Sequence, residues 1–313
     1  MIKNKIDGVK PFNEFLYKSC YYHQLMAGLE CFGIEAKEVL LNGFVFIKEN
    51  FETDQTGILS EREFEKRFGY KNKKSDLGKR KLIKSIDKGR PIIVGVDCFY
   101  LESRADTYRR FHDPHFVLIY GYDLEKREVN AVDHSYRNGF EYQEKILSMD
   151  NILLANKMYK KNIAFKRWSC RILCTEKRKA IKQIDLLREI DEKRLIDSRK
   201  NSKTNLETLK KLLGEDLQTL SEKSEIITKY LQSVRLSLYG LLKAEMFNRN
   251  TENNFFLSEL ITAYSYLISL FLKMTNQQNF EFASKHMENI FRKIDLINEM
   301  EDKIYGLLSE AHK

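Results

Sequence analysis

The chain changes character near residue 175, and this change limits the folds that are open to it. All three prolines, Pro11, Pro91 and Pro114, lie before that point, where short apolar runs are separated by turn signals. Residues 176–313 contain no proline, and apolar residues recur there at steps of three and four, the period of an amphipathic helix. The pattern predicts an α+β domain over residues 1–175, followed by an all-α helical bundle domain over residues 176–313.

The first half predicts one apolar helix followed by a mostly antiparallel sheet. The helix begins at Cys20, with Ser19 as its N-cap and Gly33 as its stop. Strand-type runs follow at residues 39–47, 91–100, 115–122, 129–132 and 163–174.

The second half predicts three long amphipathic helices whose apolar stripes cover residues 217–241, 257–271 and 290–308. A charged lead-in helix precedes them at residues 178–199, and Asn201-Ser202-Lys203 is the expected break between the two. The run Phe255 to Leu272 is apolar, but it contains Glu259 and only just reaches bilayer-spanning length, so we interpret it as a core helix. Long amphipathic helices also allow a homodimer through this domain.

Cys20 lies at a position that favours a reactive thiolate. At the first turn of a helix, unpaired backbone N–H groups and the positive end of the helix dipole stabilise a negative charge. His115 opens a buried-type strand about a hundred residues later, and Asp133 follows in the next short strand. This is the chain order of a papain-like catalytic triad. A buried core cysteine, the common fate of a cysteine on an apolar helix, is the competing interpretation.

Composition narrows the class of protein. The hydrophobic fraction of 42% is ordinary for a soluble protein, and five cysteines at irregular spacing without a signal-peptide pattern indicate a reducing cytoplasm. The net charge of +9 is concentrated in residues 61–90, with 12 basic and 5 acidic side chains, and in residues 157–182, with 10 and 1. Neither segment alternates aromatic and basic residues, and no zinc-finger or similar DNA-reading motif is present, so we expect no nucleic acid. These segments suit either an acidic protein partner or a solvated face.

Three ordered blocks carry a resemblance to a known family. They are Pro91-Ile92-Ile93-Val94-Gly95-Val96-Asp97-Cys98-Phe99-Tyr100, then Pro114-His115-Phe116-Val117-Leu118-Ile119-Tyr120-Gly121-Tyr122-Asp123, then Ala131-Val132-Asp133. Together with the Cys20 helix they resemble the N-terminal domain of the butirosin acyltransferase family over roughly residues 12–175. The amide synthetase of closthioamide assembly is similar to the same broad group.

The resemblance implies a papain-like fold that is used to make amides. Such enzymes take an acyl group from the phosphopantetheine thioester of an acyl or peptidyl carrier protein and give it to a small amine. Cys20 would be the nucleophile, His115 the general base and acid, and Asp133 the orienting carboxylate. No tightly bound cofactor is implied, and the basic segments suit an acidic carrier protein. A cysteine peptidase or thioesterase, and a non-catalytic binding module, remain the alternatives.

The donor to the oxyanion is less well defined. Papain-like enzymes usually place a glutamine six residues before the cysteine, and this position is Glu14 here. An ionised glutamate would repel an oxyanion, so we assign the side-chain donor to Asn13 and the second hydrogen bond to the Cys20 backbone N–H. Gln24, one helical turn after Cys20, is assigned to the substrate pocket.

Three further residues are assigned to substrate binding: Asp97, Tyr100 and His112. Asp97 ends an apolar strand, where a carboxylate is rarely placed without a partner, and an acceptor amine would be one such partner. The polar residues His112, Asp113, His115, Asp133 and His134 also admit a zinc site, but the Asp113-Pro114 turn does not hold them on one face, so we predict no metal.

Overall fold

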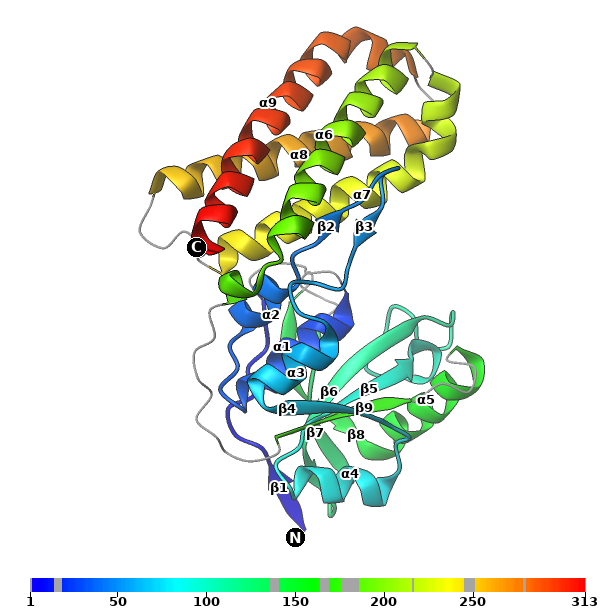
Figure 1. Ribbon diagram of the computed structural model, residues 1–313. Coiled ribbons are helices and arrows are strands. Elements are labelled where there is room, and N and C mark those ends of the chain that lie inside the picture. The colour runs from blue at the N-terminus through cyan, green and yellow to red at the C-terminus, as the bar shows by residue number, and fades with distance from the viewer. Residues whose placement is uncertain are drawn as a thin grey trace. The chain divides into compact units, whose positions relative to one another are not determined.

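The computed structural model describes residues 2–13, 19–135, 141–163, 169–175, 186–215, 217–244, 251–277 and 280–312 (Figure 1). The chain forms two compact units. Unit 1 comprises Met1–Ala36 and Arg62–Gln183, and unit 2 comprises Lys37–Glu61 and Ile184–Lys313. Unit 1 is built around an antiparallel sheet and unit 2 is mainly helical, so the α+β fold class is confirmed.

Unit 1 contains a seven-stranded sheet with the order β4-β9-β5-β6-β7-β8, and β1 pairs with β6. All of the described strand pairs in this sheet are antiparallel. The strands are β1 (Lys3–Lys5), β4 (Tyr70–Ser75), β5 (Ile92–Asp97), β6 (Pro114–Asp123), β7 (Glu128–His134), β8 (Tyr142–Ser148) and β9 (Cys170–Thr175). The helices are α1 (Cys20–Glu30), α3 (Glu61–Phe68), α4 (Lys79–Ile86), η1 (Cys98–Tyr100) and α5 (Met149–Asn162).

Helices cover both faces of this sheet. Val94 and Val117 belong to a buried cluster with side chains of α4 and α5 such as Leu82 and Ile152, so these two helices cover one face. Successive strand residues point to opposite faces. Leu118 therefore points to the other face, against which α1 packs.

Gly28 lets α1 approach the sheet closely. A Cβ atom at this position would lie 2.6 Å from Cδ1 of Leu173 and 3.2 Å from Cδ1 of Leu118. Both leucines are fully buried, so neither can move aside freely. The glycine therefore sets the depth at which α1, and Cys20 at its start, lies on the sheet.

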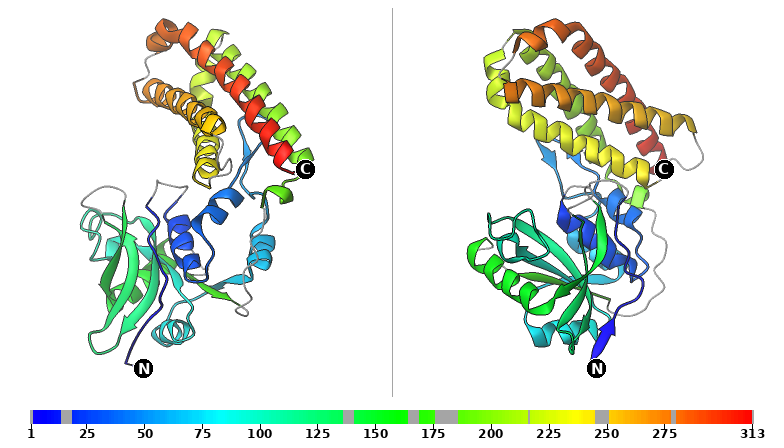
Figure 2. Two further views of the ribbon diagram at one scale, coloured as in Figure 1. Left: turned by 90° about the vertical axis from the view of Figure 1, so that its left-hand side faces the viewer. Right: turned by 180° about the vertical axis from the view of Figure 1, so that it is seen from behind.

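Unit 2 combines a short arm with four long helices (Figure 2). The arm contains α2 (Ala36–Asn42) and the antiparallel pair β2 (Phe46–Ile47) and β3 (Thr53–Asp54). The other elements are η2 (Leu186–Glu189), α6 (Glu192–Glu215), α7 (Leu217–Lys243), α8 (Thr251–Gln277) and α9 (Phe280–His312). Consecutive helices from α6 to α9 pack on each other, and α6 also packs on α9, which closes a four-helix bundle.

Polar side chains of α6 and α7 bind the main chain of the arm. Ser237 Oγ accepts from Val45 N–H at 3.0 Å, and Ser198 Oγ accepts from Ile47 N–H at 2.8 Å. Asn201 donates to the Ile47 carbonyl at 3.1 Å. These bonds satisfy backbone groups of the two-residue strand β2, whose described ladder partner is β3, and of Val45 just before it.

The apolar stripes predicted for the bundle are buried wherever their side chains are described. A buried polar network lies among them. Glu301 is 1% exposed and accepts from Tyr264 Oη at 2.5 Å, Ser202 Oγ at 2.6 Å and Arg199 Nη1 at 3.1 Å. Burial raises the pKa of this carboxyl, against the hydrogen bonds of Ser202 and Tyr264.

Several local predictions were wrong. The break at Asn201-Ser202-Lys203 is absent from α6, because Asn201 and Ser202 are held by tertiary partners instead of ending the helix. The strand expected over residues 39–47 begins as α2, since Ala36, Lys37, Glu38 and the leucines favour a helix. Strands β4 and β8 and helices α3 to α5 were not predicted.

The domain boundary expected near residue 175 stays a prediction. Residues 176–185 lie outside the described part of the chain, and unit 2 also takes in Lys37–Glu61, which the sequence assigned to the first domain. Among the described helices, one segment, Glu252–Lys273 of α8, is long and apolar enough to cross a bilayer, and half of its most apolar window is buried inside the structure.

Candidate active site

The candidate site lies where β6 and β7 separate. Strand β6 pairs with β5 from Ile119 back to Pro114, but its described pairing with β7 begins only at Leu118, opposite Val132. Beyond that point β7 continues to His134 along β8. The first turn of α1 takes up the freed backbone donors of β6: Phe116 N–H donates to the sulfur of Cys20, and Leu118 N–H donates to Oε1 of Gln24 at 3.1 Å.

Cys20 is the first residue of α1, with Ser19 as N-cap in extended conformation. Both predictions for this helix start are confirmed, although Ser19 makes no side-chain cap bond. The thiol is half-buried. Burial alone would raise its pKa, but the hydrogen bond and charge of His115, with backbone N–H bonds from Phe116 and Tyr21, lower the pKa of Cys20 below its ordinary value of 9.0.

His115 connects Cys20 to Asp133. Its Nε2 lies 2.8 Å from Oδ1 of Asp133, which leaves Nδ1 as the ring nitrogen for the sulfur of Cys20. His115 is 5% exposed and Asp133 is 0% exposed. Burial lowers the pKa of His115, but the bonds and charges of Asp133 and Cys20 raise it to about 9. The structure therefore brings together the three residues that the sequence placed in chain order.

Asp133 is held as a carboxylate by three donors. Besides His115, the N–H of His134 donates to Oδ1 at 2.8 Å, and Lys145 Nζ lies 3.4 Å from Oδ2. Burial opposes ionisation, but the bond and charge of His115, followed by the charge of Lys145, lower the pKa of Asp133 to about 2. Between the lowered pKa of Cys20 and pH 9, these shifts favour a thiolate beside an imidazolium, with Asp133 ionised.

Three of the other cysteines differ from Cys20 in the direction of their pKa shift. Burial raises the pKa of Cys31, Cys98 and Cys170 to about 12. Cys31 is as half-buried as Cys20, so exposure does not account for the contrast. The difference is the imidazole and the two backbone donors at Cys20.

The residues assigned to the oxyanion hole have different surroundings. Asn13 forms a two-point bond with Tyr142, donating to its carbonyl at 2.7 Å and accepting from its N–H at 2.6 Å. Its amide thus ties the segment before α1 to β8, and its role as an oxyanion donor stays a prediction. Glu14 lies outside the described residues. The Cys20 N–H has no intrahelical carbonyl to bind, because the first N–H groups of a helix never do.

Gln24 is fully buried in the wall between α1 and β6. Its carbonyl oxygen is used by Leu118, while its amide nitrogen has no hydrogen-bond partner among the described residues. Its contact with a substrate stays a prediction.

Asp97, His112 and Tyr100 lie together at the same end of the sheet. Asp97 is 0% exposed and accepts from His112 Nδ1 at 2.8 Å, Asn162 at 3.1 Å and Phe99 N–H at 3.1 Å. The carboxylate therefore orients His112, and its role in binding an acceptor amine stays a prediction. His112 is half-exposed and stacks on Phe99, with Tyr100 at 6.1 Å. The imidazole of His112 is therefore the solvent-accessible polar group beside Tyr100.

No group of three or more His, Cys, Asp or Glu side chains in the described part of the chain is arranged to hold a metal ion. His112 and His115 bind different carboxylates, Asp97 and Asp133. The ring of His134 instead lies edge-on to the ring of Tyr142, with 5.5 Å between their centroids. The ring of Tyr142 also stacks on that of His23, with 4.5 Å between centroids.

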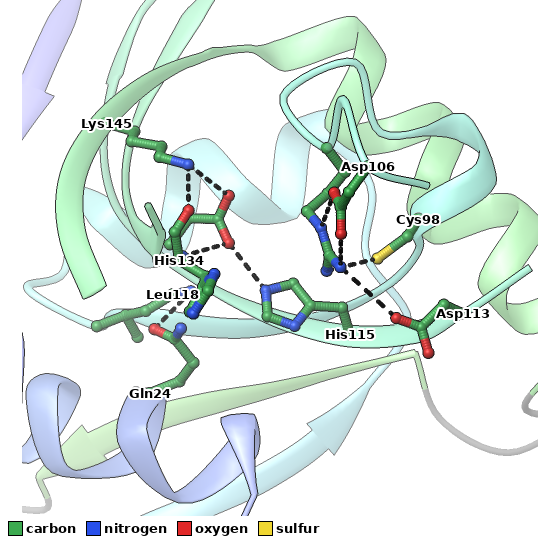
Figure 3. Close-up of polar contacts among 10 residues, drawn as sticks. Gln24, Cys98, Asp106, Asp113, His115, Leu118, His134 and Lys145 are labelled. Carbon is green, nitrogen blue, oxygen red and sulfur yellow. Dashed lines mark hydrogen bonds and ion pairs between the residues drawn. The ribbon is translucent and has the colours of Figure 1, made fainter. Parts of the chain in front are cut away.

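Two basic residues near the site were missed by the sequence analysis. Arg104 is 7% exposed and binds Asp106 through two bonds of 2.9 and 2.8 Å, the sulfur of Cys98 at 3.2 Å and Asp113 at 3.7 Å. Lys145 reaches Asp133 from β8 (Figure 3). Neither stands in a recognisable motif, so only strand pairing and loop folding bring them here.

Comparison with known proteins finds a family model whose matched region contains His115 and Asp133. Residues 47–134 match the family model described as butirosin biosynthesis protein H, N-terminal. The butirosin match covers His115 and Asp133 and ends directly after them, whereas Cys20 precedes it. A search of curated proteins finds no significant match. The butirosin match agrees with the family named from the three sequence blocks and is consistent with a biosynthetic acyltransferase.

Proposed function

We propose that this protein is a cysteine-dependent acyltransferase that forms amide bonds in secondary-metabolite biosynthesis, with unit 1 as a papain-like catalytic domain. The observation that carries the proposal is the hydrogen-bonded chain Cys20–His115–Asp133 at the start of a helix. A thiolate beside an imidazolium is the form in which such a cysteine attacks a thioester. The butirosin family match supports acyl transfer as the reaction class.

The reaction follows from the chemistry of these groups. The thiolate of Cys20 attacks the carbonyl carbon of a phosphopantetheine thioester, and the backbone N–H of Cys20 donates to the developing oxyanion. The carbon–sulfur bond to the carrier breaks, and the departing thiolate takes the proton of the His115 imidazolium to leave as a thiol. An amine then attacks the acyl-cysteine, His115 accepts its proton, and the amide leaves as the thiolate of Cys20 re-forms. Asp133 holds the ring of His115 in one orientation throughout.

A basic surface near this site supports an acidic carrier protein as the acyl donor. Residues 66–90 contain only two acidic side chains, Asp76 and Asp87. Asp76 is paired with Lys160 at 2.7 Å, and Asp87 accepts from Tyr122 Oη at 2.7 Å. Both carboxylates are therefore already engaged by other groups. We name three members of this basic surface, Lys79, Arg80 and Lys81, the α4 cations; all three are exposed.

Strand register places the α4 cations on the same end of the sheet as the candidate site. Lys81 Nζ donates to Ser75 Oγ at 2.7 Å, Ser75 pairs with Cys170, and Cys170 pairs with Val94 two residues before the partner of His115. Three strand spacings and a two-residue offset separate Ser75 from His115 by about 16 Å. A carrier bound at the α4 cations would need a long flexible arm to reach Cys20, which a phosphopantetheine group supplies.

Intact-protein mass spectrometry tests the proposal. Wild type, Cys20→Ala and Cys31→Ala would be incubated with a panel of acyl-carrier thioesters, before and after addition of small diamines. Cys31 is a matched control because it is equally half-buried but has a raised pKa. We expect an acyl adduct on wild type and Cys31→Ala only, discharged to amide by amine faster than by water. Discharge at equal rates in water alone would make the protein a hydrolase, and no adduct from any donor would refute acyl transfer.

A further inference from the structure

Lys145 lies behind the candidate triad, on the side of Asp133 away from His115. It belongs to β8, where it pairs with Ala131 of β7, two residues before Asp133. Its side chain is 14% exposed, its Nζ lies 3.4 Å from Oδ2 of Asp133, and it also donates to the carbonyl of His134. In Figure 3 the side chain of Lys145 points toward His134.

The two oxygens of Asp133 are divided between different partners. Oδ1 accepts from His115 and from the N–H of His134, whereas Oδ2 faces Lys145. A carboxylate that is held at both oxygens cannot rotate about its χ2 angle, so the oxygen that binds His115 is kept in place. Burying a lysine costs free energy through lost hydration and rotamer freedom, and this placement offsets that cost by ion pairing.

We propose that Lys145 is a positioning residue of the active site, which locks Asp133 toward His115 and whose positive charge favours the Cys20 thiolate at lower pH. This proposal takes the use of the site, acyl transfer through Cys20, from the function proposed above. The contacts of Lys145 with Asp133 and His134 do not depend on that function.

The direction of the electrostatic effect follows from the sign of the charge. A positive charge stabilises the thiolate and destabilises the imidazolium, so Lys145 lowers the pH at which Cys20 ionises and the pH at which His115 loses its proton. With an effective dielectric constant of about 40, the effect on His115 across one carboxylate, about 6 Å, is about one pH unit, and at the greater distance of Cys20, about 12 Å, it is about half a unit. The other titratable or charged groups around the site stay the same in every Lys145 variant; they are Arg104, Cys98, Asp113, His134 and Tyr142.

The test measures the rate at which chloroacetamide alkylates Cys20 as a function of pH, by peptide mass spectrometry. This neutral reagent reports the thiolate and needs no acyl donor. Lys145→Arg keeps the charge, Lys145→Gln keeps a hydrogen-bond donor without the charge, and Lys145→Met keeps neither. We expect the apparent pKa of Cys20 to rise by about half a unit in the Gln and Met variants and to remain near wild type in the Arg variant.

Lys5→Met is the matched control. Lys5 pairs with Glu144, the residue next to Lys145 in β8, at 3.1 Å with both side chains half-exposed. Its removal should leave the alkylation profile unchanged. Thermal melting shows whether each variant folds. If Lys145→Met does not fold, the comparison of Lys145→Gln with wild type decides the test.

Equal profiles for wild type, Lys145→Gln and Lys145→Met would overturn the inference, as would a fall in the apparent pKa of Cys20 or a shift of the same size in Lys5→Met. The apparent pKa of Cys20 could shift as expected while no donor gives an acyl adduct, and this pair of results has a different meaning. In that case Lys145 still positions the Cys20–His115 pair, and it is the acyltransferase function that fails.

Discussion

Replacement of Asp133 by asparagine should lower the pKa of His115 without removing its hydrogen-bond acceptor. His115 has a pKa of about 9 against an ordinary value of 6.5. Burial acts in the opposite direction, so the interactions with Asp133 and Cys20 overcome it by about 3 kcal/mol. Asparagine can still accept from Nε2 but carries no charge. If the two partners contribute comparably, the pKa of His115 should fall by more than about one pH unit.

The assay is an NMR titration of protein labelled with ¹³C at Cε1 of histidine. The chain has six histidines, and His115→Gln would assign the resonance of His115. Asp97→Asn is the control, because Asp97 binds His112 at the same end of the sheet. It should leave the titration of His115 unchanged. A pKa of His115 that stays within about 0.3 units of wild type in Asp133→Asn would refute the assignment of this charge as a main cause.

The same pKa shift makes a prediction about stability. Because the pKa of His115 is raised in the folded state, its contribution to the free energy of unfolding is complete below about pH 6.5 and is lost as pH rises through about 9. Wild type should therefore lose thermal stability between pH 7 and pH 10 more steeply than Asp133→Asn. An equal loss of thermal stability in the two proteins would contradict the link between the pKa of His115 and stability.

Two further predictions concern the carrier surface and the α1 packing. Reversal of the α4 cations to glutamate should raise KM for an acyl-carrier substrate several-fold and spare a small thioester, because the attraction is electrostatic. Gly28→Ala should lower the free energy of unfolding by about 1–2 kcal/mol, since a Cβ would lie 2.6 Å from Leu173 and push α1 off the sheet. Steady-state kinetics and denaturant unfolding are the respective measurements.

The charge reversal and the Gly28→Ala substitution each have a control. Reversal of Lys3, Lys126 and Arg127, at the opposite end of the sheet from the site, should not change KM for the carrier substrate; a rise equal to that of the α4 variant would indicate a nonspecific charge effect. Gly78→Ala should cost less, about 0.5–1 kcal/mol, because nothing lies within 4 Å of its Cβ position and only the preference of the α4 N-cap for glycine over alanine is lost. Equal losses at Gly28 and Gly78 would show that the contact with Leu173 is unimportant.

The sequence was informative where chemistry and periodicity act locally. The helix start at Cys20 followed from the N-cap Ser19 and the apolar face behind it, and the long helices of unit 2 followed from stripes at steps of three and four. The runs around His115 and Asp133 could be recognised as strands because they are rich in Val and Ile. The order of Cys20, His115 and Asp133 was therefore open to prediction.

Elements whose stability comes from remote partners could not be found in this way. Strand β4, Tyr70–Ser75, has three lysines and no apolar alternation beyond its first residue, and it forms by pairing with β9 about a hundred residues later. Asn201 and Ser202 favour a break in isolation, but inside α6 their side chains bind Ile47 and Glu301. In each case a long-range hydrogen bond overrides the local preference.

By itself, the sequence determined which residue types this protein brings to its candidate chemistry, and on which kinds of element, because N-caps, helical stripes and β-branched runs act over a few residues. The tertiary structure decided how those residues meet. Because β6 and β7 separate before Leu118, the first turn of α1 can bind the unpaired backbone of β6, and His115 lies between Cys20 and Asp133. The pairing of β8 with β7 brings Lys145 to the far oxygen of Asp133. These contacts depend on strand register and on the depth of a helix on a sheet, which are properties of the packed chain that no short stretch of sequence encodes.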